Sequence, residues 1–257
     1  MYLGPEGEIA IALSRDPVAR GVARILGVED RPLGSCCSVV RRGELLILVY
    51  DGDSLELPPE EKLRSLGIGH IVVPSRHEMA RPRPMLTAHT PGVPPSLSVA
   101  YAELKTWLFR ELCLERPPEF ECALEATHHE PNTEIVSATF IEIGSTEREW
   151  NDERPLKGLS WILGELPNYK PANAPVIMSV GDLHYSMVTQ MALDGLANVG
   201  HIIHKDVATR DLVAQAFNKH VKRPERVIFF KKSVKSPIRN EIIEKLKELG
   251  VPIELKG

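Results

Sequence analysis

The chain has 257 residues, of which 43% are hydrophobic and 5% aromatic, and its formal net charge at pH 7 is −4. This content is enough for one large core or two small ones, filled mainly by aliphatic side chains. No apolar run approaches the roughly 20 residues of a membrane span, and the first residues lack the basic and apolar regions of a secretory signal. We therefore expect a soluble, cytoplasmic protein with no membrane partner, and the negative net charge argues against indiscriminate binding of nucleic acids.

The cysteines indicate an intracellular protein. Cys36 and Cys37 are adjacent, Cys113 and Cys122 stand apart, and no two cysteines form a C-x-x-C motif. Because secreted disulfide scaffolds have denser and more regular cysteine spacings, we expect no disulfide framework.

Positive charge is concentrated in residues 204–239, called the basic segment below. It contains ten Lys or Arg and three acidic residues, so it carries +7 and leaves −11 on the rest of the chain. One interpretation is a binding surface for a polyanion. The other is a solvated helical face whose counter-charges lie elsewhere in the fold, and charge alone favours neither.

The first third of the chain alternates between strand and helix patterns. Asp16 and Pro17 are typical of a helix start, as N-cap and first-turn residue. The apolar runs are short and rich in β-branched residues, which predicts buried strands. In order, we expect a strand at 8–13, a helix at 18–26, a strand at 44–50, a helix at 59–66 and a strand at 69–74. This alternation indicates a parallel α/β sheet.

Residues 75–95 differ in composition from the segments around them. They include five prolines, three arginines and two histidines. We expect a long basic loop without regular structure, and such loops are usually functional or disordered.

The remaining two thirds continue the α/β pattern without an internal repeat. We expect helices at 98–114, 156–166, 186–193, 212–220 and 237–249, and strands at 120–126, 137–143, 176–180, 198–204, 226–230 and 251–255. The simplest account is one α/β domain over residues 1–257, with a mixed, mostly parallel sheet and helices on both faces.

Polar side chains gather where the predicted strands end, most densely in residues 121–150. In chain order they are Arg15 and Asp16; Ser75, Arg76 and His77; Thr127, His128 and His129; Ser145 and Thr146; His184; and His204 with Lys205. Open α/β sheets bind ligands outside the carboxyl ends of their strands. We therefore expect an active site at this edge.

The adjacent histidines do not form an obvious metal chelate. On an extended chain, His128 and His129 point to opposite faces, so they cannot easily bind one metal unless the turn rotates them. One of them could be catalytic while the other bonds a backbone carbonyl. His184 follows Gly181, a residue that lets the backbone approach a ligand closely.

Two carboxylates lie in predicted apolar strands. Glu125 and Glu142 each need a histidine, arginine or metal partner, because a buried unpaired carboxylate is costly. A purely structural ion pair would meet the same need. For His201, also in a predicted strand, a buried and hydrogen-bonded structural histidine is the favoured interpretation.

Other polar residues also have a structural explanation. Ser145 and Thr146 either bind a ligand or only start a helix, with Glu149 completing a capping box. His89 gains interest from its place in the long basic loop, and Trp150 is expected in the core. The sequence has no P-loop, G-x-G-x-x-G, G-x-S-x-G or H-E-x-x-H motif, which weakens the nucleotide-hydrolase, dehydrogenase, serine-hydrolase and zincin interpretations.

Five motifs occur in a characteristic order. They are His89-Thr90-Pro91-Gly92, Glu125-Ala126-Thr127-His128-His129-x-Pro131, Glu142-Ile143-Gly144-Ser145-Thr146-x-x-x-Trp150, Gly181-x-x-His184-Tyr185 and Gly200-His201-Ile202-Ile203-His204-Lys205. Together they resemble the D-aminoacyl-tRNA deacylase family of archaea and plants, which is unrelated to the small bacterial deacylase. The sequence departs from the family at Asp182 and Leu183, where glycines are usual, and at Asp206, where an aromatic residue is common.

The resemblance implies a fold related to peptidyl-tRNA hydrolase and phosphorylase-like proteins. It also implies hydrolysis of a carboxylic ester on D-aminoacyl-tRNA, with zinc as cofactor and tRNA as partner of a monomeric enzyme. We expect His128 or His129 as general base, oriented by Glu125 or Glu142. The other expected roles are Thr127 and His184 at the oxyanion or water; Arg15, Arg76, His89, Thr90, Ser145, Thr146, His204 and Lys205 in substrate binding; and His89, His129, Glu142 and His184 as zinc ligands.

The 76–83 loop and residues 205–239 would then hold phosphates of the acceptor stem. Two competing hypotheses are a zinc amidohydrolase of a small metabolite and an RNA-binding module without catalysis. In the first of these, the charge asymmetry would be incidental.

Overall fold

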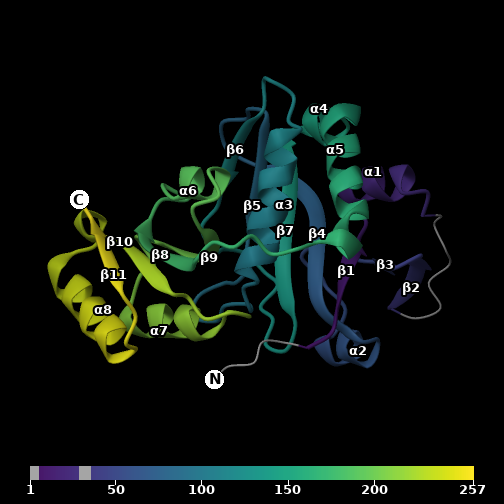
Figure 1. Cartoon of the computed structure of the whole chain (residues 1–257). Coiled ribbons are helices and arrows are strands. Elements are labelled where there is room, and N and C mark those ends of the chain that lie inside the picture. Colours follow the sequence, from purple (N-terminus) through teal and green to yellow (C-terminus); the bar gives the residue numbers. More distant parts are fainter. Residues whose placement is uncertain (1–5, 29–35) are drawn as a thin grey trace.

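The computed structural model describes residues 6–28 and 36–257, and its strands form two sheets (Figure 1). The large sheet has the order β2-β3-β1-β4-β7-β5-β6, and the small sheet has the order β11-β10-β8-β9. The strands of the large sheet are β1 (Glu8–Leu13), β2 (Cys37–Arg42), β3 (Leu45–Tyr50), β4 (Ile68–Glu78), β5 (Met85–His89), β6 (Glu121–Leu124) and β7 (Ser137–Ser145). Those of the small sheet are β8 (Val176–Asp182), β9 (Asn198–His204), β10 (Arg226–Phe230) and β11 (Ile253–Lys256).

Most strand pairs are parallel, and the α/β class is confirmed. The exceptions are β2 with β3 and β5 with β7, which are antiparallel. The expectation of one sheet is corrected, because the strands from Val176 onward form a separate parallel sheet. An apolar run marks a strand but does not show which strand it pairs with.

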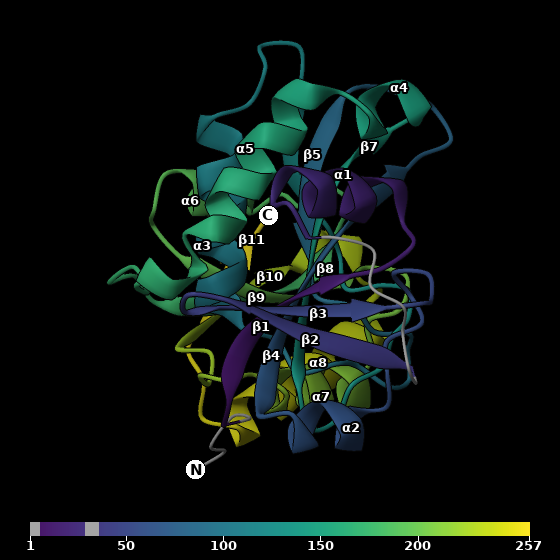
Figure 2. The same cartoon turned by 90° about the vertical axis from the view of Figure 1, so that its right-hand side faces the viewer.

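Helices cover both faces of the large sheet (Figure 2). The helices of the described chain are α1 (Pro17–Ile25), α2 (Glu60–Ser65), α3 (Ala102–Leu114), α4 (Glu147–Trp150), α5 (Glu153–Gly164), α6 (Thr189–Leu193), α7 (Arg210–Asn218) and α8 (Ser236–Glu248), with 3-10 turns η1 (Leu166–Asn168) and η2 (Lys231–Ser233). Of these, α7 and α8 pack with the strands of the small sheet. On one face of the large sheet, Val22, Leu108 and Leu159 of α1, α3 and α5 share a buried cluster with the strands. On the other, Leu63 of α2 packs in a second cluster with Phe140.

Helix α3 joins the two sheets. It packs on β5 and β7 of the large sheet and on β9 of the small one. Lys105 Nζ donates to Gly200 O at 2.6 Å, and Val199 N donates to Thr106 Oγ1 at 2.8 Å. The segment after β6 makes a second junction, since Ala126 N and Thr127 N each donate at 2.8 Å to the small-sheet side, to the carbonyls of His184 and Ile202. Residues that flank the histidine pair are therefore fixed by both sheets.

Three expectations about local structure are wrong. Residues 75–95 are not one loop, because β4 continues to Glu78 and the segment also contains β5. The prolines on both sides of β5 obscured its five-residue strand pattern in the sequence. Strand β2 has no counterpart in the prediction. Cys113 and Cys122 form a disulfide with Cα atoms 6.1 Å apart, since the end of α3 lies beside β6, which the spacing alone does not reveal. In the described part of the chain, no helix has the length and hydropathy to cross a membrane.

Lys105 offers a test of the α3 junction. Its side chain is fully buried, and the described residues include no carboxylate paired with it, so burial lowers its pKa to about 7 from 10.5. Between these two values the unfolded chain binds a proton that the folded chain does not, so stability rises with pH. Raising the pH from about 7.5 to about 9.5 should add about 2 kcal/mol to the free energy of unfolding from this group.

Urea denaturation at both pH values checks this prediction. Lys105→Met should lose the rise, whereas Lys157→Met, at an exposed site on α5, should keep it. An unchanged rise in Lys105→Met would show that the buried amine does not titrate in this range.

Candidate active site

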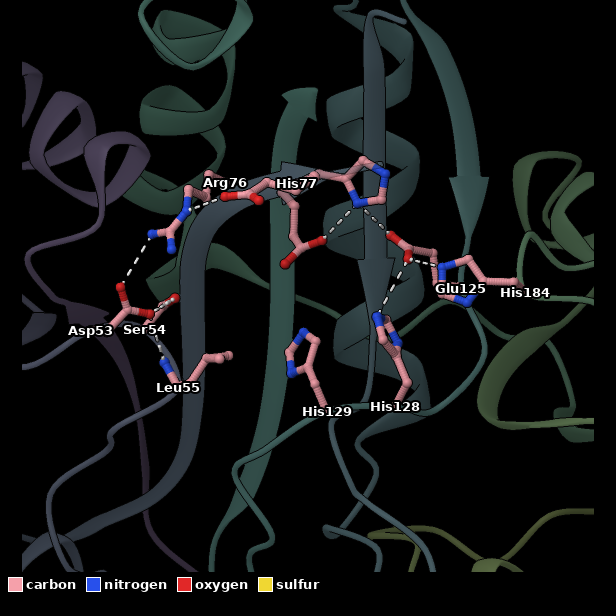
Figure 3. Close-up of a pocket in the computed structure, with 11 residues that line it drawn as sticks. Asp53, Ser54, Leu55, Arg76, His77, Glu125, His128, His129 and His184 are labelled. Carbon is pink, nitrogen blue, oxygen red and sulfur yellow. Dashed lines mark hydrogen bonds and ion pairs between the residues drawn. The ribbon is translucent and has the colours of Figure 1, made fainter. Parts of the chain in front are cut away.

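A pocket of about 400 Å³ opens where the two sheets meet. Figure 3 shows Arg76 and Asp53 at one side, Glu125 and His184 at the other, and His77, His128 and His129 between them. The full lining is Asp53, Ser54, Leu55, Arg76, His77, Glu78, Glu125, His128, His129, Glu142 and His184. The site therefore combines residues from three of the six predicted polar clusters.

Strand direction explains why this pocket is not at a simple carboxyl edge. Strands β5 and β6 run opposite to β4 and β7, so His89 at the end of β5 pairs with Phe140 in the middle of β7. The turn after β6 is thereby brought over Glu142, which also lies within β7. The active site was expected at the carboxyl edge of the sheet. The pocket instead lies across the middle of β7 and the end of β4.

Glu125 is the centre of the cluster. Its side chain is fully buried, and it lies 2.9 Å from His184 Nε2, 3.2 Å from His77 Nδ1 and 3.7 Å from His128 Nε2. Burial opposes ionisation, but His184 and His77 hold the pKa of Glu125 well below its ordinary value. The carboxylate is therefore charged and depends on imidazoles from three separate segments.

His77 is the positive member of the cluster. Burial disfavours its charged form, but hydrogen bonds and negative charge from Glu125 and Glu142 outweigh burial and raise the pKa of His77 to about 10. Its Nε2 lies 3.0 Å from Tyr185 Oη, and its carbonyl accepts from Trp150 Nε1 at 3.1 Å. His77 is thus fixed on every side as an imidazolium.

Glu142 has the partners that its burial requires. Ser75 Oγ donates to it at 2.9 Å, Thr87 Oγ1 at 3.1 Å, and His77 Nδ1 lies 3.3 Å away. His89 Nδ1, at 3.9 Å, is too far for a hydrogen bond. Two carboxylates thus share one imidazolium, which leaves the cluster with excess negative charge.

The turn at the histidine pair is rotated, so both rings face the cluster. His129 has a backbone φ of +41°, a left-handed conformation that breaks the extended chain. Gly92 N donates to the carbonyls of both His128 and His129, at 3.2 and 2.7 Å, which ties the turn to the segment after β5. The obstacle to a shared metal site, side chains on opposite faces, is therefore absent.

The ring nitrogens of the pair are oriented by backbone carbonyls. His128 Nδ1 lies 2.7 Å from Ala126 O, and His129 Nδ1 lies 2.6 Å from Glu130 O. With Nδ1–H donated in this way, each Nε2 keeps its lone pair toward the pocket. Burial, against the charge of Glu125, lowers the pKa of His128, so this ring is a neutral base.

His184 is positioned by the turn after β8. Asp182 accepts hydrogen bonds from Leu183 N at 2.8 Å and Met187 N at 2.9 Å, so it stabilises this turn. Gly181 has a φ of +72°, and a Cβ there would lie 2.9 Å from Phe230 O. This glycine is thus required by the protein's own backbone.

The donor set fits a metal such as zinc. One atom from each of His89, His128 and His129 lies within 4.8 Å of the others, and so do the groups Glu125, His128, His184 and His77, Glu125, Glu142. Metal-bound histidines typically donate their other ring N–H to a carbonyl, as His128 and His129 do. His89 Nδ1 and both Glu125 oxygens are buried without a hydrogen-bond partner in the described structure. Of the ligands implied by the resemblance, His89 and His129 group with His128, whereas His184 groups with Glu125 and His128, and Glu142 groups with His77 and Glu125. The zinc ligand set stays a prediction.

Arg76 is held by acidic residues on the opposite side of the pocket. Its guanidinium pairs with Asp16 at 2.9 Å, Asp53 at 3.2 Å and Glu78 at 2.8 Å. We call Asp16, Asp53, Arg76 and Glu78 the acidic wall. Three carboxylates around one guanidinium make the surroundings of Arg76 unfavourable for a phosphate. Its substrate-binding role stays a prediction.

The model of the D-aminoacyl-tRNA deacylase family matches residues 65–254, a range that includes every histidine and glutamate of the cluster. The chain belongs to this family. The D-aminoacyl-tRNA deacylase of Pyrobaculum calidifontis is 43% identical over 245 residues, covering 94% of this chain and 96% of that protein. That of Pyrobaculum neutrophilum is 44% identical over 246 residues, with 94% and 96% covered, and that of Aeropyrum pernix is 27% identical over 275 residues, with 96% and 99% covered.

A solved structure supports the fold. The crystal structure of a conserved protein of unknown function matches with a TM-score of 0.83 at 23% identity, over 97% of this chain and 95% of that chain. The α/β fold of this deacylase-family chain is therefore shared with an experimentally determined structure.

Several predicted site residues do not line the pocket. Thr127 is buried and bonds His201 Nδ1 at 2.9 Å, which confirms His201 as a structural histidine. Thr146 is the N-cap of α4 and forms the capping box with Glu149. The remaining residues also lie outside the lining: Thr90 is buried, Ser145 donates to Arg83 O at 2.8 Å, Arg15 pairs with Asp51 on the surface, and His204 and Lys205 are half-buried at the end of β9.

His77 lies in a predicted polar cluster but was given no role in the site, Tyr185 was noted only within a motif, and Asp53 was not predicted at all. A signal for His77 existed, because Ser75 and His77 alternate beyond the apolar run and so share one face of an extended β4. Asp53 lies in a loop with no strand pattern. No feature of the sequence alone could have assigned it.

Gly144 tests how closely the deacylase cluster is packed. A Cβ at this position would lie 2.6 Å from His77 Cβ and 2.6 Å from His77 O. We expect Gly144→Ala to displace His77 and to lower the free energy of unfolding by about 1–3 kcal/mol. Gly164→Ala in α5, where nothing lies within 4 Å, should be neutral or stabilising by up to about 1 kcal/mol. Equal stabilities of the two variants in urea would contradict the close contact.

Proposed function

We propose that this chain hydrolyses the ester bond between a D-amino acid and the 3′-terminal ribose of tRNA, releasing the free D-amino acid and tRNA. Membership of the D-aminoacyl-tRNA deacylase family supports the substrate. The buried Glu125 centre, with three imidazoles around one carboxylate, supports the chemistry. A soluble cytoplasmic location and a monomeric state stay predictions.

The reaction needs an activated water, a stabilised oxyanion and a leaving group that receives a proton. Water attacks the ester carbonyl carbon, the carbon–oxygen bond to the ribose breaks, and the base passes the water proton to the ribose oxygen. The positive charge of His77, fixed in the pocket before substrate arrives, would stabilise the oxyanion electrostatically.

His128 is the best candidate for the base. It is neutral, its Nε2 lone pair faces the pocket, and Glu125 at 3.7 Å would stabilise the imidazolium it forms. His129 is less suitable, because its Nε2 lies 2.9 Å from His89 Nε2 and is engaged there. Ala126 O therefore orients the ring, His128 moves the proton, and Glu125 stabilises the imidazolium that forms.

The fit of the histidines to zinc favours a metal-dependent form of the same reaction. His89, His128 and His129 would hold the ion, next to Glu125 and His184. Bound zinc supplies a water of lowered pKa and polarises a carbonyl. Because His128 Nε2 has one lone pair, His128 serves either as base or as ligand, and metal removal distinguishes the two roles.

The deciding experiment uses D-Tyr-tRNA and L-Tyr-tRNA, each with untreated and chelator-treated protein. We expect selective hydrolysis of the D-ester, and a loss of about 10²-fold or more in kcat for Glu125→Gln. Activity lost with the chelator and restored by zinc would make His128 a ligand, and retained activity would make it the base. An unchanged D-ester would refute the proposed function, and binding without turnover would favour an RNA-binding module. Turnover of a small amide instead of the ester would favour an amidohydrolase.

The basic segment is proposed to bind the acceptor stem. Four of its cations have acidic partners, namely Arg210, Lys219, Lys222 and Arg226. Among the described residues, the other six form no ion pair: Lys205, Arg223, Lys231, Lys232, Lys235 and Arg239. Three of these lysines lie within five residues at the turn between β10 and α8. The polyanion interpretation thus applies to the six unpaired cations, and the interpretation with counter-charges elsewhere in the fold applies to the four paired ones.

Salt dependence tests this division. Replacing Lys231, Lys232 and Lys235 together with Gln should weaken tRNA binding and reduce the slope of log affinity against log salt by about 2 to 3. The matched control, Arg210→Gln, Lys222→Gln and Arg226→Gln, removes paired cations and should change the slope less. Equal slopes in the two triple variants would remove the preference for the unpaired lysines.

A further inference from the structure

The acidic wall has a charge imbalance that the proposed mechanism does not use. Asp16, Asp53 and Glu78 surround the single guanidinium of Arg76, so three negative charges meet one positive charge. Across the pocket, Glu125 and Glu142 share the imidazolium of His77. The pocket is therefore acidic at both ends.

An independent observation also indicates a missing positive charge. Glu125 is 1% exposed and lines the pocket, yet neither of its carboxylate oxygens has a hydrogen-bond partner of good geometry in the described part of the chain. A cation held by the histidines would compensate the Glu125 end. It would leave the excess charge of the wall in place.

The three carboxylates of the wall are not equivalent. Asp16 is fully buried and accepts from the backbone N–H groups of Val18 and Arg76 at 2.8 and 3.0 Å, so it is structural. Glu78 has a side chain that is 63% exposed, mostly in solvent. Asp53 lies between these extremes, since its side chain is 39% exposed.

Asp53 is held in place, but its carboxylate has unused hydrogen-bond acceptor positions. Its Oδ2 contacts Arg76 at 3.2 Å, and its Oδ1 accepts from Ser54 Oγ at 3.1 Å and from Leu55 N at 3.4 Å. These contacts are long for charge-assisted hydrogen bonds, and a carboxylate has about four acceptor positions. Asp53 thus has capacity for a cationic donor from the pocket.

The proposed substrate carries charges of both signs. Its tRNA part carries phosphates, which this wall repels, whereas the aminoacyl part carries an α-ammonium group. We propose that Asp53 binds the α-ammonium of the aminoacyl group and thereby selects substrates with a charged amine. This inference rests on the proposed function. It places the aminoacyl end between the acidic wall and the histidines, with the phosphates outside the pocket.

The test compares kcat/KM for D-Tyr-tRNA, its N-methyl derivative and its N-acetyl derivative. N-methylation adds size but keeps the charge, whereas N-acetylation removes the charge. The wild-type protein should prefer the two charged substrates over the N-acetyl one by about tenfold or more. In Asp53→Asn, kcat/KM should fall for the two charged substrates and stay unchanged for the N-acetyl substrate, so that the preference is lost. Glu153→Gln, which removes an exposed carboxylate paired with Arg24 on α1, should behave as wild type.

Two results would overturn the proposal. They are equal wild-type activity on charged and uncharged substrates, and an equal loss on all three substrates in Asp53→Asn. If the wild-type protein hydrolyses none of them, the proposed function fails by itself. Calorimetric binding of D-tyrosinamide and N-acetyl-D-tyrosinamide then decides the role of Asp53, because the charged amide should bind more tightly to wild type but not to Asp53→Asn.

Discussion

The ionised carboxylate of Glu125, removed from water, is the constraint on which the site depends. A buried charge without partners costs several kcal/mol, so the structure must keep imidazoles beside it. His77 comes from β4, His128 from the turn after β6, and His184 from the turn after β8 in the other sheet. Figure 3 shows the contacts of Glu125 with these three imidazoles, so one side chain links segments that belong to both sheets.

The same junction keeps its buried histidines neutral. His201 and His220 are fully buried near Lys105, and burial lowers the pKa of His201 well below the ordinary value and that of His220 to about 3. The difference from His77 is the presence of carboxylates, because His201 bonds only a hydroxyl and backbone carbonyls. The two buried histidines behind the pocket are therefore uncharged, and the amine of Lys105, with a pKa lowered to about 7, loses its charge as the pH rises above neutral.

The sequence predicted what local patterns control. Asp16 and Pro17 start α1, and Thr146 and Glu149 form the capping box. Apolar runs predicted nine of the eleven strands of the described structure at least in part, all except β2 and β5. Pairing could not be predicted, since it depends on contacts far apart in the chain. The rotated histidine turn was equally hidden, because the φ of His129 is stabilised by Gly92, 37 positions earlier.

The site was predicted best where a residue's chemistry demanded partners. Glu125 and Glu142 had to be paired, and the pairing led to the correct region although not to His77. Arg76 lines the pocket, but its phosphate contact was predicted from a basic sequence context, whereas folding surrounds it with carboxylates from three other positions. Charge density along the sequence does not show which cations acquire acidic partners in the fold. Within the described structure, Lys231, Lys232 and Lys235 form no ion pair and Arg76 forms several. The chain consequently separates its charges, with an acidic pocket between the sheets and unpaired lysines beside the small sheet.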